Sequence, residues 1–262
     1  MSNGLAHDAI RVEGFSLAYQ PSVQVLQDID LTVKQGEFVS LVGPSGCGKT
    51  TLLNALAGLV QATTSGKAEL MGHAPQLGSG DVAYMLARDS LLPWRDALGN
   101  AAFGMEVRGV PRTERERRAT SFLKRVGLGG HLHSLPKALS HGMRQRVALA
   151  RTFAMSSQVL LMDEPFGALD AQTKLHLQDL LLELSQTEKH TVVFVTHDLA
   201  EAVAVSDRVI ILASHPGRVI ADMRIDLPRP RSVRSLQKDP AFHALYAKVW
   251  SHLESGWVHH EG

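Results

Sequence analysis

The chain has 262 residues, of which 44% are hydrophobic and 20% charged, and its formal net charge is +1. This size suits one large α/β domain or two small ones, and the near-neutral charge gives no support for nucleic acid or an acidic partner. A single cysteine, Cys47, excludes an intrachain disulfide and fits a reducing cytoplasm. We expect no signal peptide and no membrane span, because no apolar run approaches the roughly 18 residues that cross a bilayer.

The first part of the chain is predicted to alternate short strands with turns. Residues 9–42 contain β-like runs, and the apolar run at 38–42 is typical of a buried strand. Residues 50–60 have the apolar spacing of a helix, and residues 66–86 return to short strands. From 88 to about 155 the pattern is helical and more polar. Thr113, followed by Glu116, predicts a capping box at a helix start.

The second part is predicted to be a βαβ unit followed by a tail. Residues 159–162 and 191–197 are apolar β-type runs that flank a helical pattern at 171–186, which indicates a parallel sheet. Two closing strands surround a His-Pro-Gly turn, and PRPR at 228–231 is predicted to be a linker. A final helix from about Pro240 places apolar residues on one face, namely Phe242, Leu245, Val249 and Leu253.

A glycine-rich turn, LVGPSGCGKTT at 41–51, separates a predicted strand from a predicted helix. It contains the complete P-loop pattern, in which glycines let backbone N–H groups point at one anion and the helix N-terminus adds a favourable dipole. Lys49 would reach the β- and γ-phosphates, the Thr50 hydroxyl would bind Mg²⁺, and Thr51 would touch the α-phosphate. A turn without a ligand is the alternative. The predicted nucleotide-binding residues of this P-loop are Gly43, Pro44, Ser45, Gly46, Cys47, Gly48, Lys49, Thr50 and Thr51.

Polar side chains also follow two later strands. The run VLLMDEP ends with Asp163 and Glu164, whose side chains project in different directions. Asp163 would hold Mg²⁺, and Glu164 would act as a general base that polarises water for in-line attack on the γ-phosphate. His197 ends the next apolar run, and we expect it to contact the γ-phosphate or the attacking water. The alternatives are an exposed acidic turn and a structural histidine.

Together these motifs resemble those of the ATP-binding cassette (ABC) ATPases. The discriminating piece is LSHGMRQR at 139–146, here called the signature segment. The resemblance covers nearly the whole chain. It implies the α/β P-loop NTPase fold of ABC ATPases, with an N-terminal antiparallel β subdomain, a RecA-like parallel-sheet core and an inserted α-helical subdomain. It also implies one domain over 1–262, with the helical subdomain at approximately 88–155 and a C-terminal extension at 228–262.

The resemblance further implies that two cassettes pack head to tail. Each ATP would then lie between the P-loop of one chain and the signature segment of the other. Ser140 would cap a helix whose N-terminus faces the anion, and Gly142 would let the backbone come close. Tyr19 would stack on adenine, with ordinary packing as the alternative, and Asp170 would contact the partner's site.

A finer resemblance and two departures concern the loops. LLPWRDALGN at 91–100 and the HPGRV…DLPRPR tail resemble the nitrate/sulfonate/taurine import group. Ala87 stands where relatives carry a glutamine that touches Mg²⁺ and the attacking water, so hydrolysis would slow unless water, Arg88 or Asp89 takes that place. His141 replaces the first signature glycine, and it either adds a donor to the partner's nucleotide or points away.

Two other features leave alternatives open. A basic cluster is interleaved with glutamates and is better explained as a solvated helix face than as a nucleic-acid contact; it comprises Arg112, Arg115, Arg117 and Arg118. Trp94 is either part of a docking surface for a partner helix or packed within the helical subdomain.

We therefore predict the ATP-hydrolysing subunit of an importer, with ATP and Mg²⁺ as cofactors. Two copies would form a homodimer, peripheral at the cytoplasmic face of the plasma membrane, on an integral membrane permease that an external solute-binding protein supplies, without nucleic acid. One alternative is a soluble ABC ATPase that acts on nucleic acid or ribosomes, which would need a coiled-coil insertion or two fused cassettes. The other is a P-loop small-molecule kinase, which would lack the signature segment. Nitrate, taurine, alkane sulfonates and vitamin precursors are all open as solutes.

Overall fold

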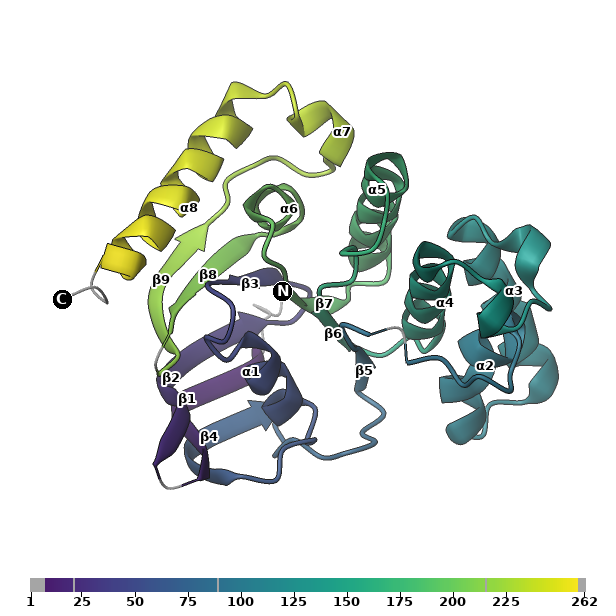
Figure 1. Cartoon of the computed structure of the whole chain (residues 1–262), viewed down its shortest axis with the longest axis horizontal. Coiled ribbons are helices and arrows are strands. Elements are labelled where there is room, and N and C mark those ends of the chain that lie inside the picture. The colour runs from purple at the N-terminus through teal and green to yellow at the C-terminus, as the bar shows by residue number, and fades with distance from the viewer. Residues whose placement is uncertain (1–7, 21, 89, 215, 259–262) are drawn as a thin grey trace, which may run out of the picture.

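The strands of the computed structural model, which describes residues 8–20, 22–88, 90–214 and 216–258, form two sheets (Figure 1). The smaller sheet is antiparallel, in the order β2–β1–β4, and consists of β1 (Asp8–Gln20), β2 (Val23–Lys34) and β4 (Thr63–Leu70). The larger sheet has the order β5–β6–β7–β3–β8–β9 and is parallel except for its last pair. Its strands are β3 (Phe38–Val42), β5 (Val82–Met85), β6 (Val159–Asp163), β7 (Thr191–Val195), β8 (Arg208–Ala213) and β9 (Arg218–Arg224).

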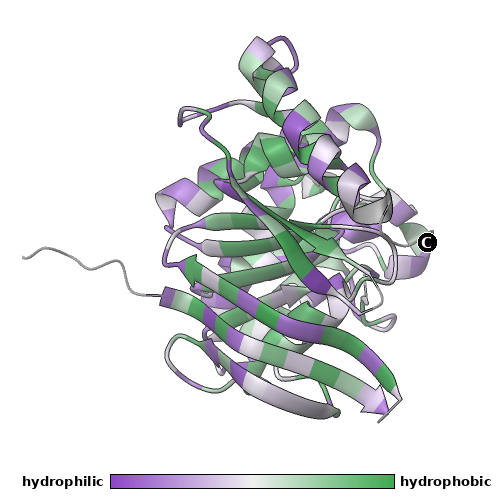
Figure 2. Cartoon of the chain, turned by 90° about the vertical axis from the view of Figure 1, so that its left-hand side faces the viewer, coloured by the Kyte–Doolittle hydropathy of each residue, from purple (hydrophilic) through white to green (hydrophobic). Residues whose placement is uncertain are grey.

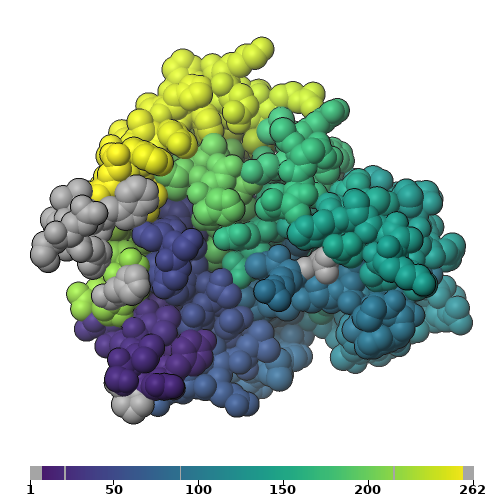
Figure 3. Space-filling model, in the orientation of Figure 1, coloured from purple at the N-terminus to yellow at the C-terminus, as the bar shows by residue number. Residues whose placement is uncertain are grey.

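The described helices fall into three groups. One helix, α1 (Lys49–Leu56), follows β3 directly. Three helices form a lobe beside the larger sheet, and this helical lobe is teal in Figures 1 and 3. They are α2 (Ala97–Val107), α3 (Arg112–Arg125) and α4 (His141–Ala154). The others are α5 (Ala171–Thr187), α6 (Leu199–Val205), α7 (Val233–Leu236) and α8 (Pro240–Val258), with short 3₁₀ turns at Gly129–His131 and Pro136–Ala138.

Both faces of the larger sheet are covered at its centre, which explains why β3, β6 and β7 are buried along their whole length rather than on alternate residues. In β3, Phe38 and Val42 face the core shared with the helices that follow β5, whereas Val39 and Leu41 face the core shared with α1 and the smaller sheet. In the smaller sheet, β1 and β2 alternate between buried and more exposed residues over much of their length (Figure 2). Helix α1 is therefore buried between the two sheets.

The carboxyl ends of β3, β6 and β7 meet at one edge of the larger sheet. Leu41 of β3 pairs with Val195 of β7, and Val195 pairs with Asp163 of β6. Because parallel strands end at the same edge, the segments that follow Val42, Asp163 and Val195 are brought together there. This is where the P-loop, Glu164 and His197 lie.

One predicted local feature is wrong. Helix α3 begins at Arg112, directly after Pro111, so Thr113 already lies in the first turn and makes no side-chain cap. Proline, with φ −53°, starts the helix without needing a cap for its own missing N–H. The carboxylate of Glu116 instead accepts a hydrogen bond from Arg112 Nε at 2.7 Å. This pair and the one between Arg117 and Glu114 lie on an exposed face.

The C-terminal part packs back on the larger sheet. Strands β8 and β9 form an antiparallel hairpin, and α8 buries Phe242, Val249 and Leu253. The PRPR segment connects β9 to α7 and is anchored, since Arg229 Nε lies 2.7 Å from a carboxylate oxygen of Asp207. The segment after β9 is thus fixed to the loop that precedes β8.

Candidate functional site

The P-loop is shaped by glycines in the left-handed region. Gly43, Gly46 and Gly48 have φ values of 153°, 81° and 94°, and Gly48 is the N-cap of α1. A Cβ at Gly43 would overlap the carbonyl oxygen of Leu212 in β8, whereas a Cβ at Gly46 would meet no atom within 4 Å. Gly46 is therefore needed for its backbone conformation and Gly43 also for close packing.

The hairpin turn after β8 backs the P-loop from behind. Gly217 N donates to Val25 O at 2.8 Å, and Gln27 N donates to Gly217 O at 2.9 Å, which bonds the turn to β2. A Cβ at Gly217 would overlap the carbonyl oxygen of Cys47 in the P-loop. The phosphate-binding turn thus rests on a segment about 170 residues further along the chain.

Lys49 and the buried Cys47 lie inside the P-loop. Lys49 Nζ donates to the carbonyl oxygens of Gly43, at 2.8 Å, and Pro44, at 2.9 Å, and lies 3.5 Å from Cys47 Sγ. The thiol is fully buried. The ammonium group is therefore held against the turn itself, where a phosphate anion would meet it together with the backbone N–H groups.

A polar cleft of about 520 Å³ opens over the P-loop. Both side chains predicted to act on the attacking water, Glu164 and His197, face this nucleotide cleft. Its lining residues are Ser45, Gly46, Gly48, Lys49, Thr50, Thr51, Glu164 and His197.

Thr50 and Asp163 form a pair of oxygen ligands at the base of the nucleotide cleft. Thr50 Oγ1 donates to Asp163 Oδ2 at 2.8 Å. Burial raises the pKa of Asp163, and the hydrogen bond from Thr50 opposes that shift only in part. One hydroxyl and one carboxylate beside a phosphate site fit Mg²⁺, which keeps several waters and takes few protein ligands. Among the described residues, no group of three or more His, Cys, Asp or Glu side chains could hold a metal alone.

Glu164 is held in an uncommon backbone conformation next to His197. Its φ is 46°, a left-handed value that is rare outside glycine, and such strain concentrates at functional sites. Its backbone N–H donates to Val195 O at 2.9 Å, so the residue is fixed to the neighbouring strand. His197 Nδ1 lies 3.4 Å from Glu164 Oε2, and both side chains are partly exposed to the cleft.

Gln145, in the signature segment, was not among the predicted site residues. Its side chain is buried; Nε2 donates to Glu164 O at 3.2 Å and Oε1 accepts from Ala168 N at 3.0 Å. The amide therefore connects α4 to the loop that carries Glu164. Only the position of a glutamine within the signature segment could have drawn attention to it.

Three predicted residues outside the lining of the nucleotide cleft belong to the signature segment or to the start of α5. Ser140 caps α4, accepting from Met143 N at 3.3 Å, and Asp170 caps α5, accepting from Thr173 N at 3.0 Å. Gly142 lies against the loop that ends at Asp170, since a Cβ added at this position would be 3.3 Å from Ala168 O. The structure thus groups the signature segment with the loop 167–170, apart from the P-loop of the same chain.

Tyr19 is exposed at the end of the β1–β2 hairpin. It is 52% exposed, and its neighbour Ala18 pairs with Gln24. Further along β2, Val25 and Leu26 touch the position that a Cβ of Gly48 would occupy. The hairpin end that carries Tyr19 therefore lies beside the P-loop, where an aromatic ring is free to stack on a base.

One departure from the family pattern lies in the loop after β5, and the other lies at the start of α4. Ala87 and Arg88 are exposed beyond the end of β5 and are not part of the cleft lining, and Asp89 lies outside the described residues. His141, the first residue of α4, is also exposed. Trp94 is 73% exposed, which favours the docking interpretation over packing within the helical lobe.

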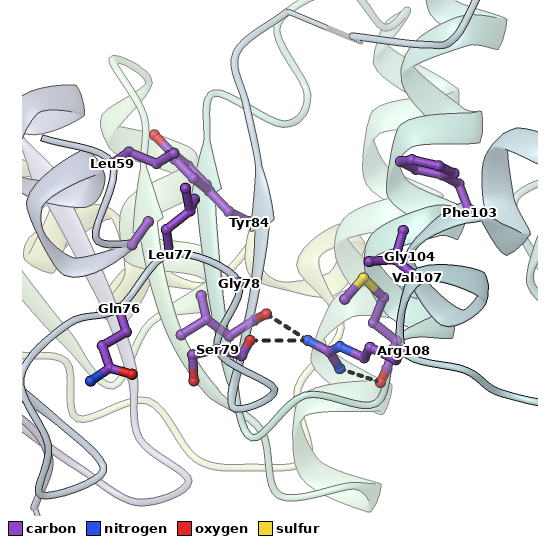
Figure 4. Close-up of a pocket in the computed structure, with 13 residues that line it drawn as sticks. Leu59, Gln76, Leu77, Gly78, Ser79, Tyr84, Phe103, Gly104, Val107 and Arg108 are labelled. Atoms are coloured by element: carbon purple, nitrogen blue, oxygen red, sulfur yellow. Dashed lines mark hydrogen bonds between the residues drawn. The ribbon is translucent and has the colours of Figure 1, made fainter.

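A second hollow, of about 280 Å³ and mainly apolar, lies between the helical lobe and the sheets (Figure 4). We call it the apolar groove. Leu77 and Val107 are 72% and 71% exposed at this groove. Its lining residues are Ala57, Leu59, Gln76, Leu77, Gly78, Ser79, Val82, Tyr84, Phe103, Gly104, Val107, Arg108 and Met155.

Arg108 closes one end of the apolar groove. Its guanidinium donates to the carbonyl oxygens of Ser79, Val82 and Met155 at 2.9–3.3 Å (Figure 4). It also donates to Ser157 Oγ at 3.0 Å. It therefore joins α2 to β5 and to the segment before β6. A groove whose floor is fixed in this way offers a preformed apolar surface.

The fold and the site define an ATP-binding cassette, and comparisons agree. The model of the ABC transporter family matches residues 26–167. A dimeric ATP-binding cassette in a post-hydrolysis state, bound to ADP and Pi, matches with a TM-score of 0.75 and 28% identity, over 84% of this chain and 100% of that one. A dimeric bacterial ABC transporter cassette matches with a TM-score of 0.76 and 29% identity over the same shares.

Similar sequences give the same class. An uncharacterised ABC transporter ATP-binding protein of Methanocaldococcus jannaschii is 48% identical over 82% of this chain and 80% of its own. A taurine import ATP-binding protein of Pseudomonas putida is 42% identical over 88% of this chain and 91% of its own. The chain belongs to the ABC transporter ATP-binding family and is an ATP-binding ATPase of a transporter. None of its described helices is long and apolar enough to span a membrane.

Proposed function

We propose that this chain is the ATP-hydrolysing subunit of an importer for a small solute of the nitrate, sulfonate and taurine group. The observation that carries this proposal is the similarity to taurine import ATP-binding proteins. The alignment with one such protein from Pseudomonas putida covers 94% of this chain and 97% of the relative, at 41% identity. The match therefore includes much of the C-terminal extension, which we assign with the rest of 1–262 to one domain.

Two copies of the chain would clamp two ATP molecules. The P-loop backbone and Lys49 would hold the β- and γ-phosphates, and Tyr19 would stack on the adenine. Ser140 and Gly142 begin a 14-residue helix, so its N-terminus can face the γ-phosphate bound to the other copy. Separation of the signature segment from the P-loop within one chain supports this arrangement, as do the dimeric cassettes among the similar structures.

The chemistry would be an in-line attack of water on the γ-phosphate. Glu164 would accept the water proton as general base, and His197, 3.4 Å from it, would orient the water or the γ-phosphate. Mg²⁺, held by Thr50 and Asp163, would supply charge stabilisation at the phosphates when bound. Lys49 and the backbone N–H groups would stabilise the charge that develops on the oxygens.

The apolar groove would receive a cytoplasmic helix of the permease. Exposed leucine and valine side chains at a preformed hollow are typical of protein contacts, and Trp94 offers a further apolar surface in the loop after β5. This contact would hold the chain peripherally at the cytoplasmic face of the membrane, with the solute-binding protein on the other side. No feature of the described residues favours the nucleic-acid alternative.

Growth and transport of a deletion strain test the solute class. The strain is supplied in turn with taurine, an alkane sulfonate, nitrate or a vitamin precursor as the required nutrient. We expect growth on one of them to fail, and to return with the wild-type gene but not with Lys49→Ala. Normal growth and normal uptake of every solute would contradict the proposal.

A further inference from the structure

Lys174, which no motif includes, stands between two parts of the site. It lies in the first turn of α5, and its backbone N–H donates to Asp170 O at 2.9 Å. Asp170 in turn caps the same helix. Lys174 and the end of the loop 167–170 therefore belong to one rigid turn, and a displacement of either displaces the other.

The ammonium group of Lys174 contacts the segment that carries His197. Its Nζ lies 2.9 Å from Asp198 Oδ2 and forms a second ion pair with Glu201. Asp198 follows His197 directly and caps α6, accepting from Ala200 N and Glu201 N at 2.9 and 3.2 Å. One lysine thus connects the N-terminus of α5 with the N-terminus of α6.

The residue before His197 is tied into the same network. Thr196 Oγ1 donates to Glu201 Oε2 at 2.5 Å and accepts from Asp198 N at 3.0 Å. Thr196 and Glu201 are buried, and the Lys174 side chain is only 25% exposed. The backbone on both sides of His197 is therefore held by a network of Thr196, Asp198 and Glu201, in which Lys174 contacts both carboxylates. The imidazole itself lines the nucleotide cleft.

Charge balance shows that the network depends on the lysine. Burial raises the pKa of Glu201, and hydrogen bonds from Lys174 and Thr196 only partly offset this. Burial acts in the same direction on Asp198, but the contacts from Lys174 lower its pKa overall. Removal of the ammonium group would leave two neighbouring carboxylates without a cation, which the protein would relieve by protonation or by moving Asp198.

We propose that Lys174 is a positioning residue, which sets the place of His197 and couples it to the loop 167–170. This inference rests on the role of His197 in the proposed function. It predicts that a change at Lys174 acts on turnover through His197 and leaves nucleotide binding nearly intact, because Lys174 does not line the nucleotide cleft.

The test is a double-mutant cycle in the full chain with Mg-ATP. Lys174→Met should lower kcat about tenfold, since a displaced group loses much of its effect, with KM changed less than about twofold. Lys174→Arg, which keeps the charge, should stay within about threefold of wild type. In a His197→Ala background, Lys174→Met should change kcat less than about twofold, because effects through one group do not add.

Controls separate positioning from general stability. Lys238→Met, at an exposed lysine before α8, should leave kcat and Tm unchanged. If Lys174→Met is unstable, it is replaced by the double variant Lys174→Met with Glu201→Gln. This variant removes the more buried of the two unpaired carboxylates and keeps a partner for Thr196. The same nonadditivity with His197→Ala is expected for that pair.

The outcomes are distinguishable. An unchanged kcat for Lys174→Met, or an equal fold-loss in both backgrounds, would overturn the proposal for Lys174 alone. A His197→Ala protein with wild-type kcat would overturn both the role of His197 in the proposed function and its coupling to Lys174. A fall in kcat that follows the unfolded fraction in thermal unfolding would show a purely structural lysine.

Discussion

The nucleotide cleft and the apolar groove lie in one chain but are built in opposite ways. The cleft is lined by backbone, hydroxyl and charged groups at the end of the larger sheet, and most of its residues come from one short run, 45–51. The apolar groove draws its lining from five separated stretches between Ala57 and Met155. A phosphate site needs closely spaced backbone groups, whereas an apolar contact needs only area. Mutations in the nucleotide cleft should therefore affect hydrolysis, and mutations in the apolar groove should affect association with the permease.

The largest effect is expected for Glu164→Gln. Loss of the proposed general base should lower kcat at least about a hundredfold, because such bases contribute 10²–10⁴ in rate. Binding should persist, since the backbone and Lys49 are unchanged, and ATP should then accumulate in a dimer. Steady-state hydrolysis and size-exclusion chromatography with Mg-ATP measure the two effects. A protein that stays monomeric with saturating Mg-ATP, alone and with its permease, would contradict the two-chain site.

The apolar groove is tested by Leu77→Asp. An unpaired carboxylate buried in an apolar contact is costly, so co-purification with the permease should fall by about tenfold or more. Ile220→Asp, at an exposed apolar residue on β9, is the matched control and should co-purify normally. Thermal unfolding would check that both variants are folded. Undiminished association of Leu77→Asp would remove the groove as the docking surface.

A smaller effect is expected at Ala87. Ala87→Gln would restore the amide that the family resemblance places at the attacking water, and we expect kcat to rise about threefold in the purified protein. Ala74→Gln, at an exposed alanine in the loop before β5, should have no effect. An unchanged or lower rate for Ala87→Gln would show that the missing amide does not limit turnover.

The smallest effect concerns stability. Burial raises the pKa of Asp163 in the folded chain, so ionisation of this carboxyl opposes folding. The stability that the protonated form contributes is fully present below the usual carboxyl pKa and is lost as pH rises through the folded pKa. Without nucleotide, Asp163→Asn should therefore raise Tm at pH 7 by roughly 2–4 °C. The gain should shrink toward pH 4. Calorimetry across this pH range measures Tm, and a gain in Tm that does not depend on pH would contradict this explanation.

The amino-acid sequence alone predicted those features that depend on neighbouring residues in one continuous segment. The strand at 38–42 has the predicted bounds, and the order of the motifs led to the ABC fold. The roles of the site residues stay predictions, although Glu164 and His197 do meet the P-loop in one cleft. Gln145 and Lys174 could not be found in this way, because their meaning lies in contacts between distant segments. The capping box at Thr113 failed because Pro111 had already started the helix.

The contact of Gly217 with the P-loop has a consequence for the order in which the nucleotide site forms during synthesis. The family model ends at residue 167, yet the turn behind the P-loop is built from β8 and β9, which leave the ribosome much later. A nascent chain that has emerged only as far as β7 therefore carries the complete P-loop sequence without the hairpin turn that packs behind it. We therefore expect affinity for ATP to arise late in synthesis, once the β8–β9 hairpin has closed behind the P-loop.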